Sequence, residues 1–181
     1  QKVFINSYLK NDTSTSIKII LDNTDLGDFT GIFTSKMKDL KGAMNGKLAI
    51  EDVFYKPTVY ADLVVDEFTL GDELVGDVNI EMKLDSSSKK IWVNSSVKSV
   101  NNNIDIDGYV SIDPERPDIQ LKMDAPRIGL NFLNYPFFDK YVKDCRGYVT
   151  AKVQVKGTVS KPILTGSVLL VDDTVTVAYL N

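Results

Sequence analysis

Acidic side chains are the residues of this chain whose types and spacing could do chemistry. Asp105 and Asp107 share the polar side of one alternating run, and Asp66-Glu67 and Asp172-Asp173 form adjacent pairs. Two carboxylates at a suitable distance can hydrolyse a glycosidic bond, and several together can hold calcium. The spacing matches no calcium-binding loop, and nothing in the flanking residues marks one acid as buried with a raised pKa. We therefore interpret these acids as solvated strand faces and turn residues.

Two absences further limit the kinds of catalytic or metal site that the chain could form. The chain has no histidine, which removes the commonest general base, the commonest zinc ligand and every Ser–His or Cys–His arrangement. Cys145 is the single cysteine, so an internal disulfide framework is excluded and a small buried side chain is the favoured interpretation. The sequence also lacks a phosphate loop, a C-x-x-C pair and a dinucleotide-binding fingerprint. We expect no enzymatic activity, no cofactor and no metal site.

Trp92 is the only tryptophan, and it stands beside the polar-facing Asn94. One interpretation is an exposed ring that stacks on a ligand. The other, which we favour, is packing under a neighbouring loop.

Composition narrows the class of protein. A formal net charge of −4 and a pI near 4.9 provide no basic stripe, so we expect no nucleic-acid partner. Hydrophobic residues at 43% and charged residues at 25% are typical of a folded protein. No apolar run approaches the roughly 18 residues of a membrane helix, and no secretory leader opens the chain. We expect residues 1–181 to be one domain and a fragment of a larger protein.

The elements that carry these residues alternate with a period of two. The run Val78-Asn79-Ile80-Glu81-Met82-Lys83-Leu84 places apolar residues on one side and polar residues on the other. Turn-forming clusters such as residues 85–88 and 101–103 separate runs of this kind. Such strands, joined by short turns without helices between them, predict a mainly β fold built as an antiparallel meander.

A longer pattern occurs three times. A glycine opens an alternating strand, a basic residue followed by proline interrupts it, and a second alternating strand follows. The copies span about residues 46–70, 108–125 and 147–181, with Lys56-Pro57, Arg116-Pro117 and Lys161-Pro162 as their steps. Internal repeats of this kind predict a fold that grows by adding one supersecondary unit at a time.

Residues 131–143 break the alternation. Leu133, Phe137, Phe138, Tyr141 and Val142 recur at helical spacing around Pro136, a favourable first-turn residue. We expect one short helix here, laid against one end of the sheet. It would act as a plug over apolar side chains or, alternatively, as a movable lid.

The apolar sides of the strands are expected to share one face. This predicted hydrophobic groove comprises Val78, Ile80, Met82, Leu84, Ile104, Ile106, Val110, Ile112, Ile119, Leu121, Met123, Val149, Ala151, Val153, Val155, Leu164, Val168 and Leu170. Such a face must be buried against something. A single curled sheet would make it an open trough, whereas two sheets closed on each other as a β-sandwich would make it core. Periodicity alone does not separate these architectures.

The third repeat carries a resemblance to a known family. Its residues include Cys145-Arg146-Gly147-Tyr148-Val149, Val155-Lys156-Gly157-Thr158, Ser160-Lys161-Pro162 and Leu164-Thr165-Gly166-Ser167-Val168. This succession of a glycine-led strand, a Gly-Thr turn, a Lys-Pro step and a Leu-x-Gly strand resembles the TamB family, the AsmA-like translocation and assembly module, in versions most similar to those of Bacteroidetes. The match is specific over residues 124–181 and looser over the two earlier repeats, which lack the Gly-Thr turn.

The resemblance implies a fold, a place and partners. TamB proteins are anchored in the inner membrane of diderm bacteria and span the periplasm. Their repeated strands curl into a half-pipe, the β-taco, with an apolar interior. They cooperate with an outer-membrane barrel of the Omp85 class, and they are implicated in phospholipid transport between the membranes and in outer-membrane protein assembly. By this resemblance, the chain is an internal or C-terminal segment located in the periplasm.

Three functions follow as hypotheses. The first is a conduit segment whose apolar groove shelters the acyl chains of phospholipids or another apolar ligand. The second is an assembly module that holds nascent outer-membrane protein strands by strand addition. The third is a structural β-sandwich, a spacer or adhesin-type module with no apolar ligand.

Overall fold

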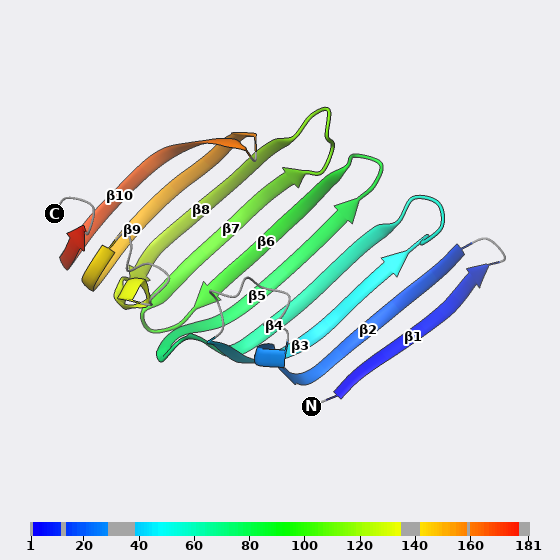
Figure 1. Ribbon diagram of the computed structural model, residues 1–181, viewed down its shortest axis with the longest axis horizontal. Coiled ribbons are helices and arrows are strands. Elements are labelled where there is room, and N and C mark those ends of the chain that lie inside the picture. The colour runs from blue at the N-terminus through cyan, green and yellow to red at the C-terminus, as the bar shows by residue number, and fades with distance from the viewer. Residues whose placement is uncertain (1, 12–13, 29–38, 135–141, 159, 178–181) are drawn as a thin grey trace.

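The protein is a single open β-sheet whose strands follow one another in chain order. The computed structural model describes residues 2–11, 14–28, 39–134, 142–158 and 160–177. Its strands are β1 (Lys2–Asn11), β2 (Ser14–Asp25), β3 (Leu40–Glu51), β4 (Thr58–Leu70), β5 (Glu73–Asp85), β6 (Lys90–Lys98), β7 (Asn102–Ser111), β8 (Asp118–Gly129), β9 (Val142–Thr158) and β10 (Lys161–Val177). Each pairs antiparallel with its neighbours in sequence, in the order β1 to β10 (Figure 1). The mainly β antiparallel meander predicted from the sequence is confirmed.

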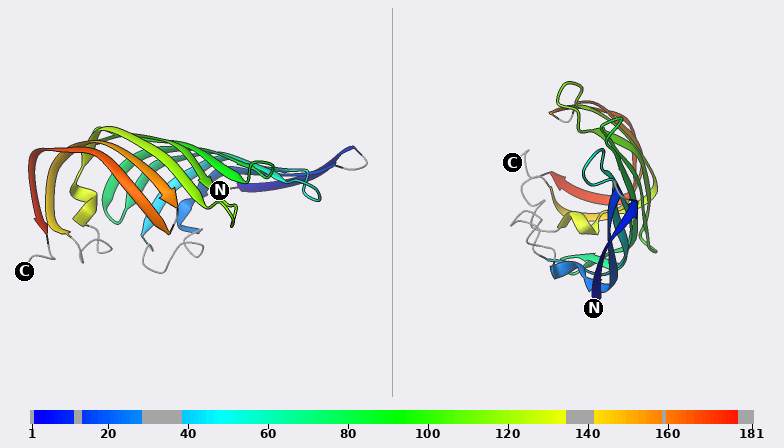
Figure 2. Two further views of the ribbon diagram at one scale, coloured as in Figure 1. Left: turned by 90° about the horizontal axis from the view of Figure 1, so that it is seen from above. Right: turned by 90° about the vertical axis from the view of Figure 1, so that its right-hand side faces the viewer.

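The sheet is curled and does not close. Viewed from its end, it forms an arc that is open on one side (Figure 2). Within the described residues β1 pairs only with β2 and β10 only with β9, and no second sheet faces the first. The structure is therefore consistent with the half-pipe and does not contain the closed β-sandwich that was its alternative.

The two long borders of the sheet differ in their connections. At one border, which we name the turn rim, the strands are joined through residues 52–57, 86–89, 112–117 and 159–160. At the other, the loop rim, the connections include the longer segments 26–39 and 130–141. All three basic-proline steps lie at the turn rim, since each sequence repeat falls on one hairpin: β3–β4, β7–β8 and β9–β10.

Bulges bend the strands near the loop rim. Register shifts interrupt the ladders after Leu21 in β2 and after Val65 in β4. Asn23 and Glu67 have left-handed φ values of 47° and 51° at these points. The amide of Asn23 donates to Asn45 Oδ1 at 2.7 Å, and that of Glu67 donates to Asp77 Oδ1 at 3.0 Å. Because an extra residue on one strand bends it, these supported bulges turn the strand ends inward.

The helix expected over residues 131–143 is corrected. A 3-10 helix, η2 (Asn131–Asn134), occupies its start, while Val142 and Lys143 already belong to β9. Their backbones pair with Val177 and Thr176 of β10, so strand pairing takes precedence over helical periodicity at this end of the segment. Residues 135–141, which include Phe137, Phe138 and Tyr141, lie outside the described residues. Within the described ranges, no helix has the length and hydropathy needed to cross a membrane.

Candidate functional site: an open apolar trough

Three rows of residues run across the concave face of the sheet. In an antiparallel ladder, residues that face each other directly point to the same side, so the register defines each row strand by strand. The first row is Val3, Leu21, Gly46, Leu63, Ile80, Ser95, Ile106, Met123, Val153, Gly166; the second is Ile5, Ile19, Leu48, Ala61, Met82, Val93, Gly108, Leu121, Val155, Leu164; the third is Ser7, Ile17, Ile50, Val59, Leu84, Ile91, Val110, Ile119, Gly157, Pro162. We call these the trough rows. They contain no charged residue.

The register places the predicted groove residues as follows. Those on the concave face are Val78, Ile80, Met82 and Leu84 of β5, Ile104, Ile106 and Val110 of β7, Ile119, Leu121 and Met123 of β8, Val149, Ala151, Val153 and Val155 of β9, and Leu164, Val168 and Leu170 of β10. The registers do not place Ile112. It follows the last residue of β7, its amide donates to the Lys89 carbonyl at 2.8 Å, and its side chain is 48% exposed.

Other trough residues were absent from the prediction. The rows also include side chains from β2, β3, β4 and β6, among them Ile19, Leu48, Leu63 and Val93. The alternation that marks them is the same signal used for β5, but Ile20 and Val64 place apolar residues on both sides of β2 and β4 and obscure it. The trough therefore crosses all ten strands.

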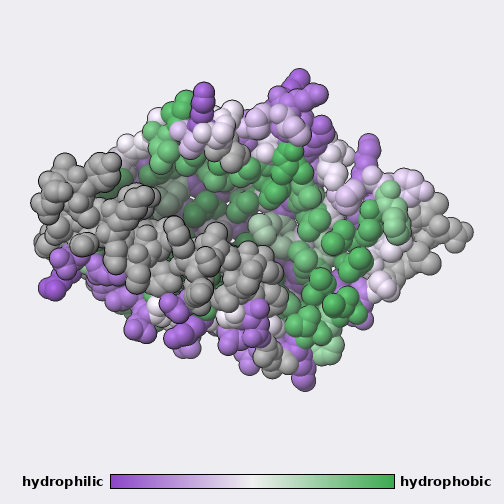
Figure 3. Space-filling model, in the orientation of Figure 1, coloured by the Kyte–Doolittle hydropathy of each residue, from purple (hydrophilic) through white to green (hydrophobic). Residues whose placement is uncertain are grey.

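The middle of the trough is open. Ile80, Ile106 and Leu121 are partly exposed, and Met82 is 38% exposed. Hydrophobic residues line the hollow of the concave face, and hydrophilic ones lie along its borders (Figure 3). Large apolar side chains that line a concave surface without complete burial form a surface suited to an apolar ligand.

Two apolar clusters cover the trough near the loop rim. In the first, Leu26 packs with Leu40, Met44, Val65 and Leu70. In the second, Leu130 and Leu133 of the η2 region pack with apolar residues that include Ala125, Ile128, Cys145, Val149 and Ala151. Both clusters bury side chains that face the trough, at the strand ends that carry the bulges. The hydrophobic core of the protein therefore lies along the loop rim, and the remainder of the concave face is left available.

Cys145 belongs to the second cluster. Its side chain is fully buried. Burial, with a smaller effect from the Asp144 carboxylate, raises the pKa of its thiol above the usual value of 9.0. A thiol in this state is a poor nucleophile, which agrees with a structural role.

Glycines allow neighbouring strands to approach closely inside the trough. Gly46 and Gly108, which open the first two sequence repeats, have φ values of 136° and 141°. A Cβ atom on Gly46 would lie 2.1 Å from the Asp62 carbonyl oxygen, and one on Gly108 would lie 2.0 Å from that of Gln120. No other residue fits these positions without moving the adjacent strand. Gly46 and Gly108 thus permit the close approach of β3 to β4 and of β7 to β8.

The opposite, outer face carries the charges. Lys47 pairs with Asp62 at 3.5 Å, Lys98 with Asp105 at 2.8 Å, and Lys152 with Asp124 at 3.4 Å, all on exposed side chains. Exposed pairs of this kind contribute little to stability but keep the outer face soluble. Asp105 and Asp107 lie here rather than in a buried site. In the described part of the chain, no group of three or more acidic or cysteine side chains is placed to hold a metal ion.

Comparisons with protein-family models, with curated proteins and with solved structures give no match.

Proposed function

We propose that this protein is a segment of a TamB-like conduit whose trough shelters the acyl chains of phospholipids as they pass between the inner and outer membranes. The observation that carries the proposal is the set of three trough rows, which cross the whole sheet without a charged residue and remain partly exposed. Row residues such as Leu63 and Val153 pack against the two apolar clusters, and the rest of this surface has no structural partner among the described residues. Burial of acyl chains would remove it from water.

The size of the trough suits such a ligand. Strands lie about 4.8 Å apart, so ten strands give a trough roughly 43 Å long. A bilayer core of about 30 Å holds two layers of acyl chains, so one extended chain needs about half that length. Each methylene removed from water contributes about 0.8 kcal/mol. Contacts of this kind have no preferred position along the rows, so they permit a chain to slide.

The resemblance to the TamB family supplies the cellular setting of this proposal. The setting is the periplasm of a diderm bacterium, with the parent protein anchored in the inner membrane and an Omp85-class barrel as its outer-membrane partner. The conduit would then deliver phospholipid to the outer membrane.

A second candidate function is support of outer-membrane protein assembly. The observation that favours it is the exposed strand β10, in which every residue from 161 to 171 is exposed. Apolar residues point to both faces of this strand, with Leu164 in the trough and Ile163 and Leu169 on the outer face. A nascent strand could pair with this edge and extend the sheet.

Photo-crosslinking in cells tests the proposal. A crosslinking residue at Ile106, in the trough, should capture phospholipid, whereas one at the adjacent Asp107, on the outer face, should not. Capture of an apolar polypeptide at position 106 instead would favour the assembly function. Capture of neither, with the protein at normal levels, would overturn both and favour a spacer without an apolar ligand.

A further inference from the structure

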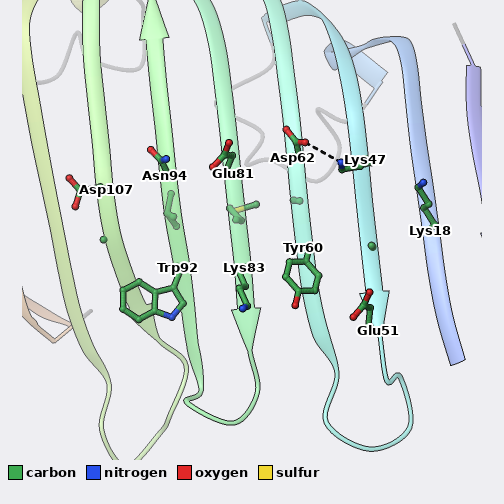
Figure 4. A pocket seen from close by; sticks show the side chains of 15 residues that line it. Lys18, Lys47, Glu51, Tyr60, Asp62, Glu81, Lys83, Trp92, Asn94 and Asp107 are labelled. Atoms are coloured by element: carbon green, nitrogen blue, oxygen red, sulfur yellow. Dashed lines mark ion pairs between the residues drawn. The ribbon is translucent and has the colours of Figure 1, made fainter. Parts of the chain in front are cut away.

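The outer face carries a pair of exposed aromatic rings that the trough does not use. Tyr60 of β4 and Trp92 of β6 lie in one cross-strand row, with Lys83 of β5 between them. They are 38% and 45% exposed. Both rings are seen face-on from outside the sheet (Figure 4), with Lys83 Nζ 5.4 Å from the centre of the Tyr60 ring and Lys90 Nζ 5.9 Å from that of the Trp92 ring. Two strand spacings separate them, which is about 9.6 Å.

A row of hydrogen-bonding groups runs beside the two rings. Asp62, Glu81, Asn94 and Asp107 occupy consecutive strands in the next outward-facing row. One pleat, about 7 Å, separates this row from the aromatic row. The two rows border a shallow depression of about 910 Å³ on the outer face (Figure 4).

The charges around this depression are mixed. Lys18, Lys47 and Lys83 line it together with Glu51, Asp62, Glu81 and Asp107, and Lys47 is already paired with Asp62. A ligand with a strong net charge of either sign would meet repulsion as well as attraction. The electrostatics therefore favour an uncharged ligand that both donates and accepts hydrogen bonds.

We propose that this surface, the Tyr60–Trp92 platform, binds an uncharged polysaccharide chain that lies across the strands. A sugar ring has an apolar face of C–H groups and a rim of hydroxyls. The C–H face suits the negative face of an aromatic ring, while the hydroxyls donate to carboxylates and the Asn94 amide. Two rings spaced by alternate strands would stack on alternate sugars of an extended chain, and Lys83 would donate to the sugar between them.

Neighbouring side chains hold Trp92 in place. The ring of Tyr109 packs against it with centroids 5.0 Å apart and an interplanar angle of 58°. The Tyr109 hydroxyl donates to Asp118 at 2.8 Å, and Lys90 Nζ lies 3.6 Å from the centre of the Tyr109 ring. Ordered aromatic groups lose little conformational entropy on binding, so this packing prepares the platform for its ligand. The platform faces away from the trough, and its function is independent of lipid.

Trp92 is the sole tryptophan, so its fluorescence reports directly on the platform. The chain would be titrated with linear neutral oligosaccharides at up to millimolar concentration: β-linked glucans, β-linked N-acetylglucosamine chains and α-linked glucans. A saturable shift of the Trp92 emission with at least one class is expected. Absence of a shift with all of them would overturn the proposal.

Variants localise the binding. Affinity electrophoresis in a gel containing the responding glycan should show retardation that Tyr60→Ala and Trp92→Ala each weaken by about tenfold, the size expected for one lost stacking contact. Tyr55→Ala removes a tyrosine outside the platform that is more exposed than Tyr60, at 72% against 38%, and should leave retardation unchanged. Equal loss in the Tyr55 variant would contradict the assignment. Circular dichroism confirms that each variant is folded, and Tyr60→Ala keeps the Trp92 reporter.

Discussion

The side-chain amide of Asn134 hydrogen-bonds both backbone polar groups of Cys145. Its Oδ1 accepts from the Cys145 amide at 2.7 Å, and its Nδ2 donates to the Cys145 carbonyl at 2.8 Å. Asn134 therefore makes the two bonds that a paired strand residue would make, and it ties η2 to the start of β9. This tie holds Leu130 and Leu133 over the second apolar cluster.

Replacement of Asn134 should loosen this end of the trough. Asn134→Ala removes both bonds to a buried residue and is expected to lower the free energy of unfolding by about 1–2 kcal/mol. Asn134→Asp keeps the acceptor and should cost less. Denaturant unfolding measures the loss, and hydrogen exchange at the Cys145 amide should accelerate. Asn131→Ala, at an exposed position, serves as the control. An equal loss of stability in that variant would contradict this role for Asn134.

A charge in the trough should abolish acyl binding without unfolding the protein. Ile106 is partly exposed, so the carboxylate of Ile106→Glu can remain hydrated, and we expect a stability loss of only about 1–2 kcal/mol. Lipid retained through purification, measured by native mass spectrometry, should fall sharply. Gln120→Glu adds the same charge on the outer face and should retain lipid. Complete unfolding of the Ile106 variant would indicate a closed core.

The stability of the sheet should depend on Gly108. A methyl group there would meet the Gln120 carbonyl at 2.0 Å with φ at 141°, so Gly108→Ala is expected to cost about 2–3 kcal/mol. Gly129→Ala is the matched control because its nearest contact is the Asn101 side chain at 3.3 Å. Thermal unfolding compares the two. Equal stability of both variants would show that position 108 does not require glycine.

Stability should depend on the ionisation of Asp113 at the turn rim. The Glu115 amide, which donates to this carboxylate, and then Lys89 at 3.2 Å hold the pKa of Asp113 below its usual value of 3.8. A lowered folded-state pKa means that the ionised group stabilises the fold above pH 3.8, and that this contribution disappears as the pH falls through the folded-state value. Asp113→Asn should therefore be less stable than the parent at pH 7 and should approach it in acid.

The control for this variant is Glu115→Gln, which removes an equal charge from the same turn. Denaturant unfolding as a function of pH measures both. A stability difference between Asp113→Asn and the parent that stays constant through the acid range would contradict the role of ionisation.

The exposed edge of the sheet should promote self-association. Leu169 is 64% exposed on the outer face of β10. Leu169→Lys is expected to reduce concentration-dependent association, since lysine on an edge strand opposes pairing with another chain. Sedimentation velocity measures the effect, and unfolding should change by no more than about 0.5 kcal/mol. Gln120→Lys, on a central strand, should leave association unchanged.

Alternation predicted the strands and the side of the sheet to which most trough residues point. This prediction succeeded because each hairpin has one apolar face and one polar face, so alternate residues of a strand lie on opposite sides of the sheet. Ile112 follows the last paired residue of β7, so the register does not place it and its inclusion stays a prediction. Alternation also could not decide between an open trough and a closed sandwich, since both architectures place the same side chains on one face of the sheet. That difference depends on the absence of a facing sheet among the described residues.

Two further differences have local causes. The apolar residues of 131–143 recur at helical spacing, but Val142 and Lys143 pair with β10. Strand pairing therefore takes precedence over helical periodicity at these two residues. Trp92 was expected to pack under a loop. It packs instead on Tyr109, its direct cross-strand neighbour, and keeps 45% of its surface exposed. Cross-strand register, which sequence alone leaves open, decides which aromatic residues meet.

The order of the strands determines how this protein responds to tension. In the described part of the chain, the backbone ladders join each strand only to its neighbours in sequence, and β1 and β10 form the two edges of the sheet. A force that pulls on the two ends of the chain therefore acts on one edge ladder at a time. The sheet would lengthen by peeling its strands in succession from the edges inward, and each strand could pair again on release.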